Sequence, residues 1–128
     1  MNMESGWCRV ERTAEGVGVL ELYGDQDLTT KDEIEAAIGS LATEERHVVL
    51  DLSRTQFVDS AVLHSIYSFA ARQTDAGRRL VLQVALDSAV RRALEVVGLL
   101  DRLPWAPERE QAIALLRNDD PSLLQTPD

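Results

Sequence analysis

The apolar residues of the chain follow two spacings, one typical of strands and the other of helices. Short runs rich in β-branched and aromatic residues predict four strands, at residues 7–13, 17–23, 48–52 and 80–86. Glu15-Gly16 separates the first two runs as a turn would, so a β-hairpin is expected there. The later two runs are mostly apolar, as inner strands covered by helices are.

Helical spacing appears between and after these strands. Apolar residues recur every three or four positions at residues 31–41, 60–74, 89–97 and 108–117, which predicts four amphipathic helices. Gly77 and Gly98 follow two of them, where a glycine commonly ends a helix. Pro107 precedes the last one, a favoured place for proline. A short edge strand is expected within 99–105, which Pro104 fits.

Two helix starts place polar side chains where negative charge is favoured. Asp59 lies at the N-cap of the second helix, where its carboxylate can accept from the free amides of the first turn. Ser60 is then the first helical residue, and unpaired N–H groups and the helix dipole favour an added phosphate on it. Asp27 or Thr29 is expected to cap the first helix, with the acids 32–33 in its first turn.

The alternation of strands and helices predicts one α/β domain over residues 7–117, with loose tails at 1–6 and 118–128. We expect a mixed, mostly parallel sheet of four or five strands with about four helices, joined by right-handed crossovers; the strand order stays open. Parallel strands end at the same edge of a sheet, where α/β proteins usually place their sites. The polar loops predicted at 24–29 and 53–60 should therefore lie side by side.

Composition narrows the classes of function. The chain has 128 residues and a formal charge of −9, which disfavours a direct nucleic-acid partner because phosphate contacts need clustered Lys and Arg. No run of about 18 apolar residues and no signal peptide is present, so no membrane insertion is expected. The single cysteine, Cys8, fits a reducing cytoplasm. A protein partner in the cytoplasm is the expected target.

The sequence contains no recognisable catalytic, metal-binding or nucleotide-binding constellation. Ser60 and His64 are one helical turn apart, but a nucleophile and base would also need an orienting group and an oxyanion site. One cysteine and the separated His47 and His64 do not make a zinc pattern, and no phosphate-cradling glycine motif occurs. We therefore expect a protein that is not an enzyme and uses no cofactor or metal, with His64 on the exposed side of its helix.

The order VVLDLS, FVDS and apolar helix, which opens at residue 48, resembles the core of STAS domains, and most closely the bacterial anti-sigma factor antagonists. The resemblance extends over roughly residues 8–117. In that family an Asp-Ser pair follows the strand, and the Ser accepts phosphate from an anti-sigma factor that is itself a kinase. Asp59 and Ser60 match that pair, and Asp25 and Asp27 match an acidic loop that contributes to the family's partner surface. Plain turn and cap roles would explain these two acids equally well.

The resemblance implies a regulatory protein that binds a kinase-type anti-sigma factor and is switched by phosphorylation of Ser60, with a serine phosphatase as a further partner. The partner surface is expected to comprise Asp25, Asp27, Thr29, Asp59, Ser60, Ala61, Val62 and His64. The family usually continues Ser/Thr-Gly after the Ser, whereas Ala61-Val62 stands here, and Val62 is expected to add bulk to that surface. This departure favours the alternative of a STAS scaffold without a switch, in a larger signalling assembly or a transporter's ATPase complex.

Overall fold

The computed structural model describes residues 6–13, 16–44 and 47–119 of the chain. The strands there are β1 (Trp7–Arg12), β2 (Val17–Gln26), β3 (His47–Val58), β4 (Arg79–Gln83) and β5 (Trp105–Ala106), and the helices are α1 (Leu28–Glu44), α2 (Ser60–Asp75), α3 (Ala89–Val96), α4 (Leu99–Arg102) and α5 (Arg109–Asp119). The predicted α/β class with one mixed sheet is confirmed. The predicted tails at 1–6 and 118–128 fall mostly outside the described residues, and the first two residues of the second tail extend α5.

The sheet has the order β1-β2-β3-β4-β5, so strands that follow one another in the sequence are neighbours in space. β1 and β2 pair antiparallel, which confirms the hairpin, and the other three pairs are parallel. Glu15 of the predicted turn lies outside the described residues, while Gly16 has a φ of +78°, which glycine adopts without strain. Parallel neighbours need a crossover connection, and the helices supply it.

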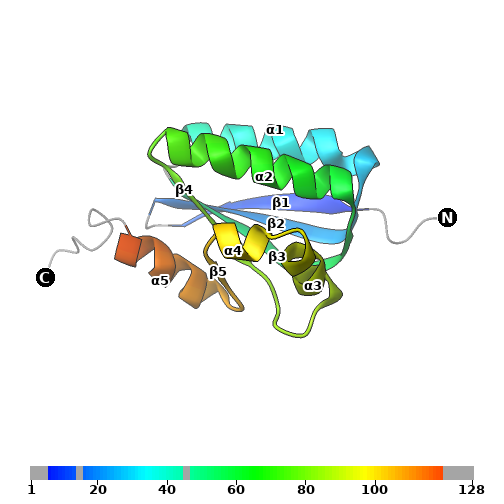
Figure 1. The fold of residues 1–128 in the computed structure, drawn as a ribbon. Coiled ribbons are helices and arrows are strands. Elements are labelled where there is room, and N and C mark those ends of the chain that lie inside the picture. The colour runs from blue at the N-terminus through cyan, green and yellow to red at the C-terminus, as the bar shows by residue number, and fades with distance from the viewer. Residues whose placement is uncertain (1–5, 14–15, 45–46, 120–128) are drawn as a thin grey trace, which may run out of the picture.

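Helices cover both faces of the sheet, and alternating strand side chains enter two separate cores. α1 and α2 lie side by side over one face, where Leu20 and Leu50 point (Figure 1). α5 lies on the opposite face, against the register partners Val19, Val49 and Val81 (Figure 1). The helices α3 and α4 join the first core through Val90, Leu94 and Leu99. The sheet is thus buried on both sides over most of its central strands, as the apolar runs predicted.

A polar row on the α5 face also attaches that helix to the sheet. Glu21, Asp51 and Gln83 are register partners on three adjacent strands and are 8%, 4% and 7% exposed. The Arg109 guanidinium donates through Nη2 to Glu21 Oε2 at 2.9 Å and Asp51 Oδ2 at 2.7 Å. Its Nε donates to Gln83 Oε1 at 2.8 Å, and its Nη1 to Glu11 Oε1 at 3.0 Å. One arginine therefore pairs the buried carboxylates of β2 and β3.

The strand β3 is longer than predicted, and the loop expected at 53–60 is wrong. Asp51 pairs with Glu21 and Phe57 pairs with Asp25, so β3 advances six residues while β2 advances four (57 − 51 against 25 − 21). The two extra residues are accommodated by two register shifts of the kind that β-bulges produce. This half of β3 has an exposed face, so its polar residues do not interrupt the strand.

The helix α1 starts earlier than predicted, at Leu28. β2 continues to Gln26, so the loop expected at 24–29 is reduced to Asp27. The acids 32–33 consequently fall beyond the first turn of the helix. The prediction failed because the bulged strand pairing, which extends β2, depends on β3 and leaves no local signal.

The segment that connects α3 to α5 also differs from the prediction. Gly98 ends α3 with a φ of +82°, and Gly77 ends α2 with a φ of +73°, both as expected. The residues after Gly98 form α4 instead of the edge strand predicted within 99–105, and β5 has only two residues. α5 begins at Arg109, so Pro107 precedes the helix instead of opening it.

Candidate functional site

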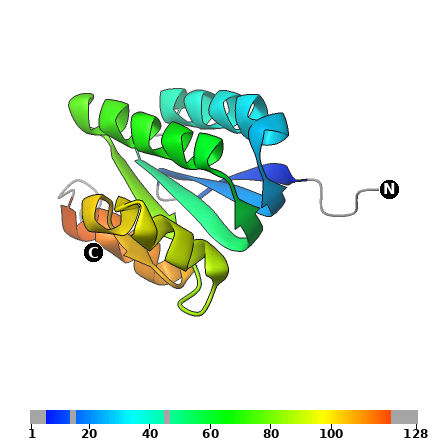
Figure 2. The same ribbon diagram turned by 45° about the vertical axis from the view of Figure 1, so that its right-hand side comes forward.

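The ends of β2 and β3 bring two helix starts side by side. Gln26 and Val58, the last residues of these strands, are register partners, and the Asp59 N–H donates to the Gln26 carbonyl at 3.1 Å. α1 and α2 each begin two residues after those strand ends. Both helix N-termini therefore lie at one edge of the sheet, as predicted (Figure 2).

The start of α1 is organised by Asp27. Its carboxylate accepts from the Thr29 N–H at 2.9 Å and from the Thr29 hydroxyl at 2.5 Å. The Thr30 hydroxyl oxygen accepts in turn from the Asp27 N–H at 3.0 Å, a reciprocal arrangement like a capping box. The hydrogen bonds from the Thr29 hydroxyl and amide hold the pKa of Asp27 below its ordinary value. Of the two predicted caps, Asp27 takes the role, and Thr29 lies inside the helix.

The start of α2 follows the prediction closely. Asp59 has an extended backbone, with φ −89° and ψ 175°, and its carboxylate accepts from the Val62 N–H at 3.0 Å. Ser60 is the first residue of the helix, and its side chain is exposed. His64 is also exposed, on the next turn of the same helix. Ser60 is thus presented to solvent by a cap that does not use its hydroxyl.

Replacing Asp59 with Ala is expected to lower the free energy of unfolding by about 1 kcal/mol, because the Val62 amide loses its acceptor. Asp59→Asn should keep most of that stability, since Asn caps helices as well as Asp does, while it removes the charge. Urea unfolding of the two variants beside wild type measures the difference. Equal stability of wild type and Asp59→Ala would mean that the cap contributes nothing.

Val62 does not lie on the surface, so the expectation that it contacts a partner is wrong. Its side chain is 0% exposed and packs in the core beneath α1 and α2. Ala61 is half-buried. The bulk that Val62 adds relative to glycine therefore fills the core, because the third residue of α2 faces the sheet. The exposed surface at this point of the helix consists of Ser60 and His64.

Two large apolar side chains at this edge escaped the sequence analysis. Leu28 is 69% exposed at the start of α1, and Phe57 is 51% exposed near the end of β3. Asp25, predicted in a loop, lies in β2 as the register partner of Phe57 and is half-buried. An apolar residue two before the Asp-Ser pair was the available signal, but its direction depends on the bulges. The edge combines exposed apolar groups with carboxylates, as protein interfaces do.

A cavity of about 230 Å³ opens beside Ser60. It is lined by Ser60, Leu63, His64, Tyr67, Val97 and Leu99. Ser60 and His64 share this cavity, but no carboxylate is among the lining residues to orient the imidazole, and no pair of backbone donors is directed at a reacting carbonyl. Across the described ranges, no group of three or more His, Cys, Asp or Glu residues is placed to hold a metal ion. The arrangement is suited to contact with a protein.

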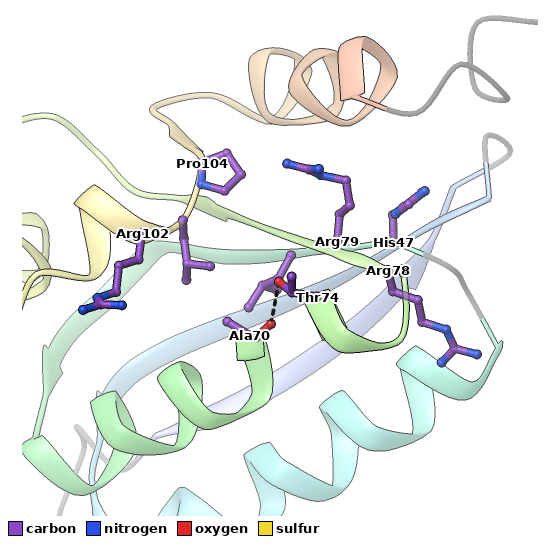
Figure 3. A pocket seen from close by; sticks show the side chains of 10 residues that line it. His47, Ala70, Thr74, Arg78, Arg79, Arg102 and Pro104 are labelled. Atoms are coloured by element: carbon purple, nitrogen blue, oxygen red, sulfur yellow. Dashed lines mark hydrogen bonds between the residues drawn. The ribbon is translucent and has the colours of Figure 1, made fainter. Parts of the chain in front are cut away.

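A larger cavity, of about 490 Å³, lies at the opposite end of α2. Its lining includes His47, Arg78, Arg79 and Arg102, and their side chains point in different directions and do not converge on one point (Figure 3). The Arg78 guanidinium instead donates to the Ala42 carbonyl of α1. Within the described part of the chain, no helix has the length and apolar character needed to cross a bilayer.

Known proteins that resemble the chain agree on one family. The family model of the STAS domain matches residues 10–112. BtrV of Bordetella bronchiseptica, whose name assigns it to the anti-sigma factor antagonists, is 31% identical over 104 residues, which cover 80% of this chain and 89% of BtrV. The crystal structure of an anti-sigma factor antagonist from Mycobacterium paratuberculosis has a TM-score of 0.76 and 25% identity, covering 91% of this chain and 97% of that one.

The fold is also that of SpoIIAA from Bacillus in its phosphorylated form, with a TM-score of 0.66 and 20% identity over 87% of this chain and all of SpoIIAA. The matched range contains the sheet, both helix starts at its edge and the Asp59-Ser60 pair. The chain therefore belongs to the STAS domain family and, within it, to the anti-sigma factor antagonists.

Proposed function

We propose that the chain binds a kinase-type anti-sigma factor through the sheet edge that carries Ser60, and that phosphorylation of Ser60 releases it. The carrying observation is the exposed Ser60 at the first position of α2, capped by Asp59 and beside the start of α1. The partner would transfer the γ-phosphoryl group of ATP to Ser60 Oγ, with release of ADP and of the hydroxyl proton. A serine phosphatase would restore the hydroxyl by hydrolysis.

The position of Ser60 explains why a phosphate would leave the fold intact and yet disturb an interface. The N-terminus of α2 favours negative charge, so the modified domain should stay folded. The phosphate adds roughly 1.5 to 2 negative charges at neutral pH. It would stand next to Asp59 and at the same sheet edge as Asp25 and Asp27. A partner surface that fits a neutral hydroxyl there would meet added bulk and charge.

The relatives support this proposal in kind. BtrV is named as an anti-sigma factor antagonist, and SpoIIAA has been solved in unphosphorylated and phosphorylated forms. The first half of the predicted partner set, from Asp25 to Thr29, and the second half, from Asp59 to His64, meet at one edge once Val62 is left out. We keep Asp25, Asp27, Thr29, Asp59, Ser60, Ala61 and His64 as the proposed contact residues.

Ser60→Asp is expected to bind the purified kinase-type anti-sigma factor of the same organism at least about 30-fold more weakly than wild type, a loss of about 2 kcal/mol. Ser60→Ala should bind like wild type and take up no phosphate from ATP, as followed by mass spectrometry. Ser40→Asp is the matched control, because it adds the same charge at an exposed serine farther along α1. Its affinity should equal that of wild type.

A second candidate function is a scaffold without a switch. Ala61-Val62 in place of the family's Ser/Thr-Gly favours it, because a kinase that reads those positions would meet different residues. Wild type that remains unmodified with its partner and ATP, together with unchanged binding by Ser60→Asp, would refute the switch and leave the scaffold.

A further inference from the structure

The cavity beside Ser60 is the first of three that adjoin along α2. A second cavity, of about 270 Å³, shares Tyr67 and Leu99 with the first. The second and the 490 Å³ cavity share Ala70, Thr74, Arg102 and Leu103. The three together form one groove, which we call the α2 groove, bounded on one side by α2 and on the other by the chain from Val97 to Pro104.

One stripe of α2 follows the whole groove. Ser60, His64, Tyr67, Ala71 and Thr74 are spaced by four, three, four and three residues, and all five are exposed. This is the spacing of the a and d positions that one helix presents to another in a two-helix contact. The stripe spans 14 residues, or about 21 Å of helix. A surface stripe of this pattern is an unpaired helix-packing face.

The opposite wall is built to stay in place. Gly98, with its φ of +82°, turns the chain between α3 and α4, so that Val97 stays 51% exposed at the groove while Leu99 is 1% exposed and anchors the wall in the core. The Arg102 guanidinium lies 5.3 Å from the centre of the Tyr67 ring and connects this wall to α2. The groove is therefore a formed surface feature and does not require a rearrangement to open.

We propose that the α2 groove is a docking site for a helix of the same kinase that modifies Ser60. This inference rests on the proposed function and adds a second contact region to it. Ser60 lines one end of the groove, so a kinase that reaches its hydroxyl must stand over that end. A helix of the kinase that packs on the α2 stripe would hold Ser60 in reach of the active site.

The chemistry of the groove specifies the character of that helix. Leu63, Tyr67, Val97 and Leu99 make the end near Ser60 largely apolar. The far cavity has three arginines and a histidine among its lining residues and no carboxylate, in a chain of net charge −9. The docked helix therefore carries aliphatic or aromatic residues near Ser60 and acidic residues at its other end. Charge complementarity of this kind sets the orientation of the partner.

Ala71→Arg tests the docking site, because it places a long side chain in the middle of the groove without disturbing the helix, for which Arg is a good former. Ala36→Arg is the matched control, at an exposed alanine of α1. Calorimetric titration with the purified kinase-type anti-sigma factor should show a Kd at least about tenfold higher for Ala71→Arg and no change for Ala36→Arg. In the phosphorylation assay the KM of Ala71→Arg should rise by a similar factor, and kcat should be unchanged.

The outcomes separate the docking site from the switch. Phosphorylation of Ser60 with equal Kd and KM for the two alanine variants would overturn the docking site and leave the proposed function standing. Absent phosphorylation with binding that only Ala71→Arg weakens would support the docking site and refute the switch. A partner that fails to bind wild type would overturn both. Wild type that sediments as a dimer, and becomes monomeric only in Ala71→Arg, would assign the groove to a second copy and overturn its assignment to the kinase.

Discussion

Replacing Val49 with Asp is expected to unfold the domain. Val49 is 0% exposed and lies in the middle of β3, with Val19 and Val81 as its register partners on either side and α5 above it. A carboxylate there would be buried with no donor to pair with, at a cost of several kcal/mol. Domains of this size are stabilised by only about 5–15 kcal/mol, so one such change removes most of the margin. Circular dichroism and thermal melting report the loss.

Val96→Asp is the matched control for this substitution. Val96 is 85% exposed at the end of α3, so the same chemical change there leaves the carboxylate in water. Its effect should stay within about 0.5 kcal/mol. A Val49→Asp protein that melts like wild type would mean that the α5 face of the sheet is not a core.

Arg109→Ala is expected to destabilise the domain by about 3 kcal/mol. The substitution leaves the side chains of Glu21 and Asp51, only 10% and 5% exposed, without their shared guanidinium. The Arg109 side chain itself is 27% exposed, which places the effect at the lower end of the range for buried ion pairs. Arg109→Lys should recover part of the loss, because one ammonium cannot reproduce the planar fork that reaches several acceptors.

The loss in Arg109→Ala should depend on pH. Burial alone would raise the pKa of Glu21, but hydrogen bonds from Arg9 and Arg109 outweigh it and hold that pKa below its ordinary value. A lowered pKa in the folded state gives stability that is present above the ordinary glutamate value of about 4.3 and is lost as the pH falls. Without Arg109 this contribution shrinks, so the difference between wild type and variant should be largest at neutral pH and decrease below about pH 4.

Urea unfolding of both proteins across this pH range measures that dependence. Arg92→Ala, at an exposed arginine of α3, controls for the loss of one positive charge from an acidic chain. A constant difference between Arg109→Ala and wild type at all pH values would show that Arg109 acts through packing and not through the carboxylates of the polar row.

The features that were predictable from the sequence depend on residues close together along the chain. The hydrophobic runs of β2, β3 and β4 and the helical spacing of α2 gave the correct kinds of element in the correct order. Asp59 was predictable as a cap because a cap needs only the residue and the amides of the next turn. The same local order, strand then Asp-Ser then helix, carried the resemblance to the STAS domains.

Features that depend on pairing between distant segments required the tertiary structure. The bulges that extend β3 to Val58 exist only because β2 lies beside it, and they decide that Phe57 is exposed. Val62 and Ser60 are two residues apart, yet only the packing of α2 on the sheet decides that the first is buried and the second presented. Arg109 meets Glu21 and Asp51 across 88 and 58 residues of chain, so no local pattern announces their contact. The α2 groove likewise forms from helices whose mutual placement is set by the core beneath them.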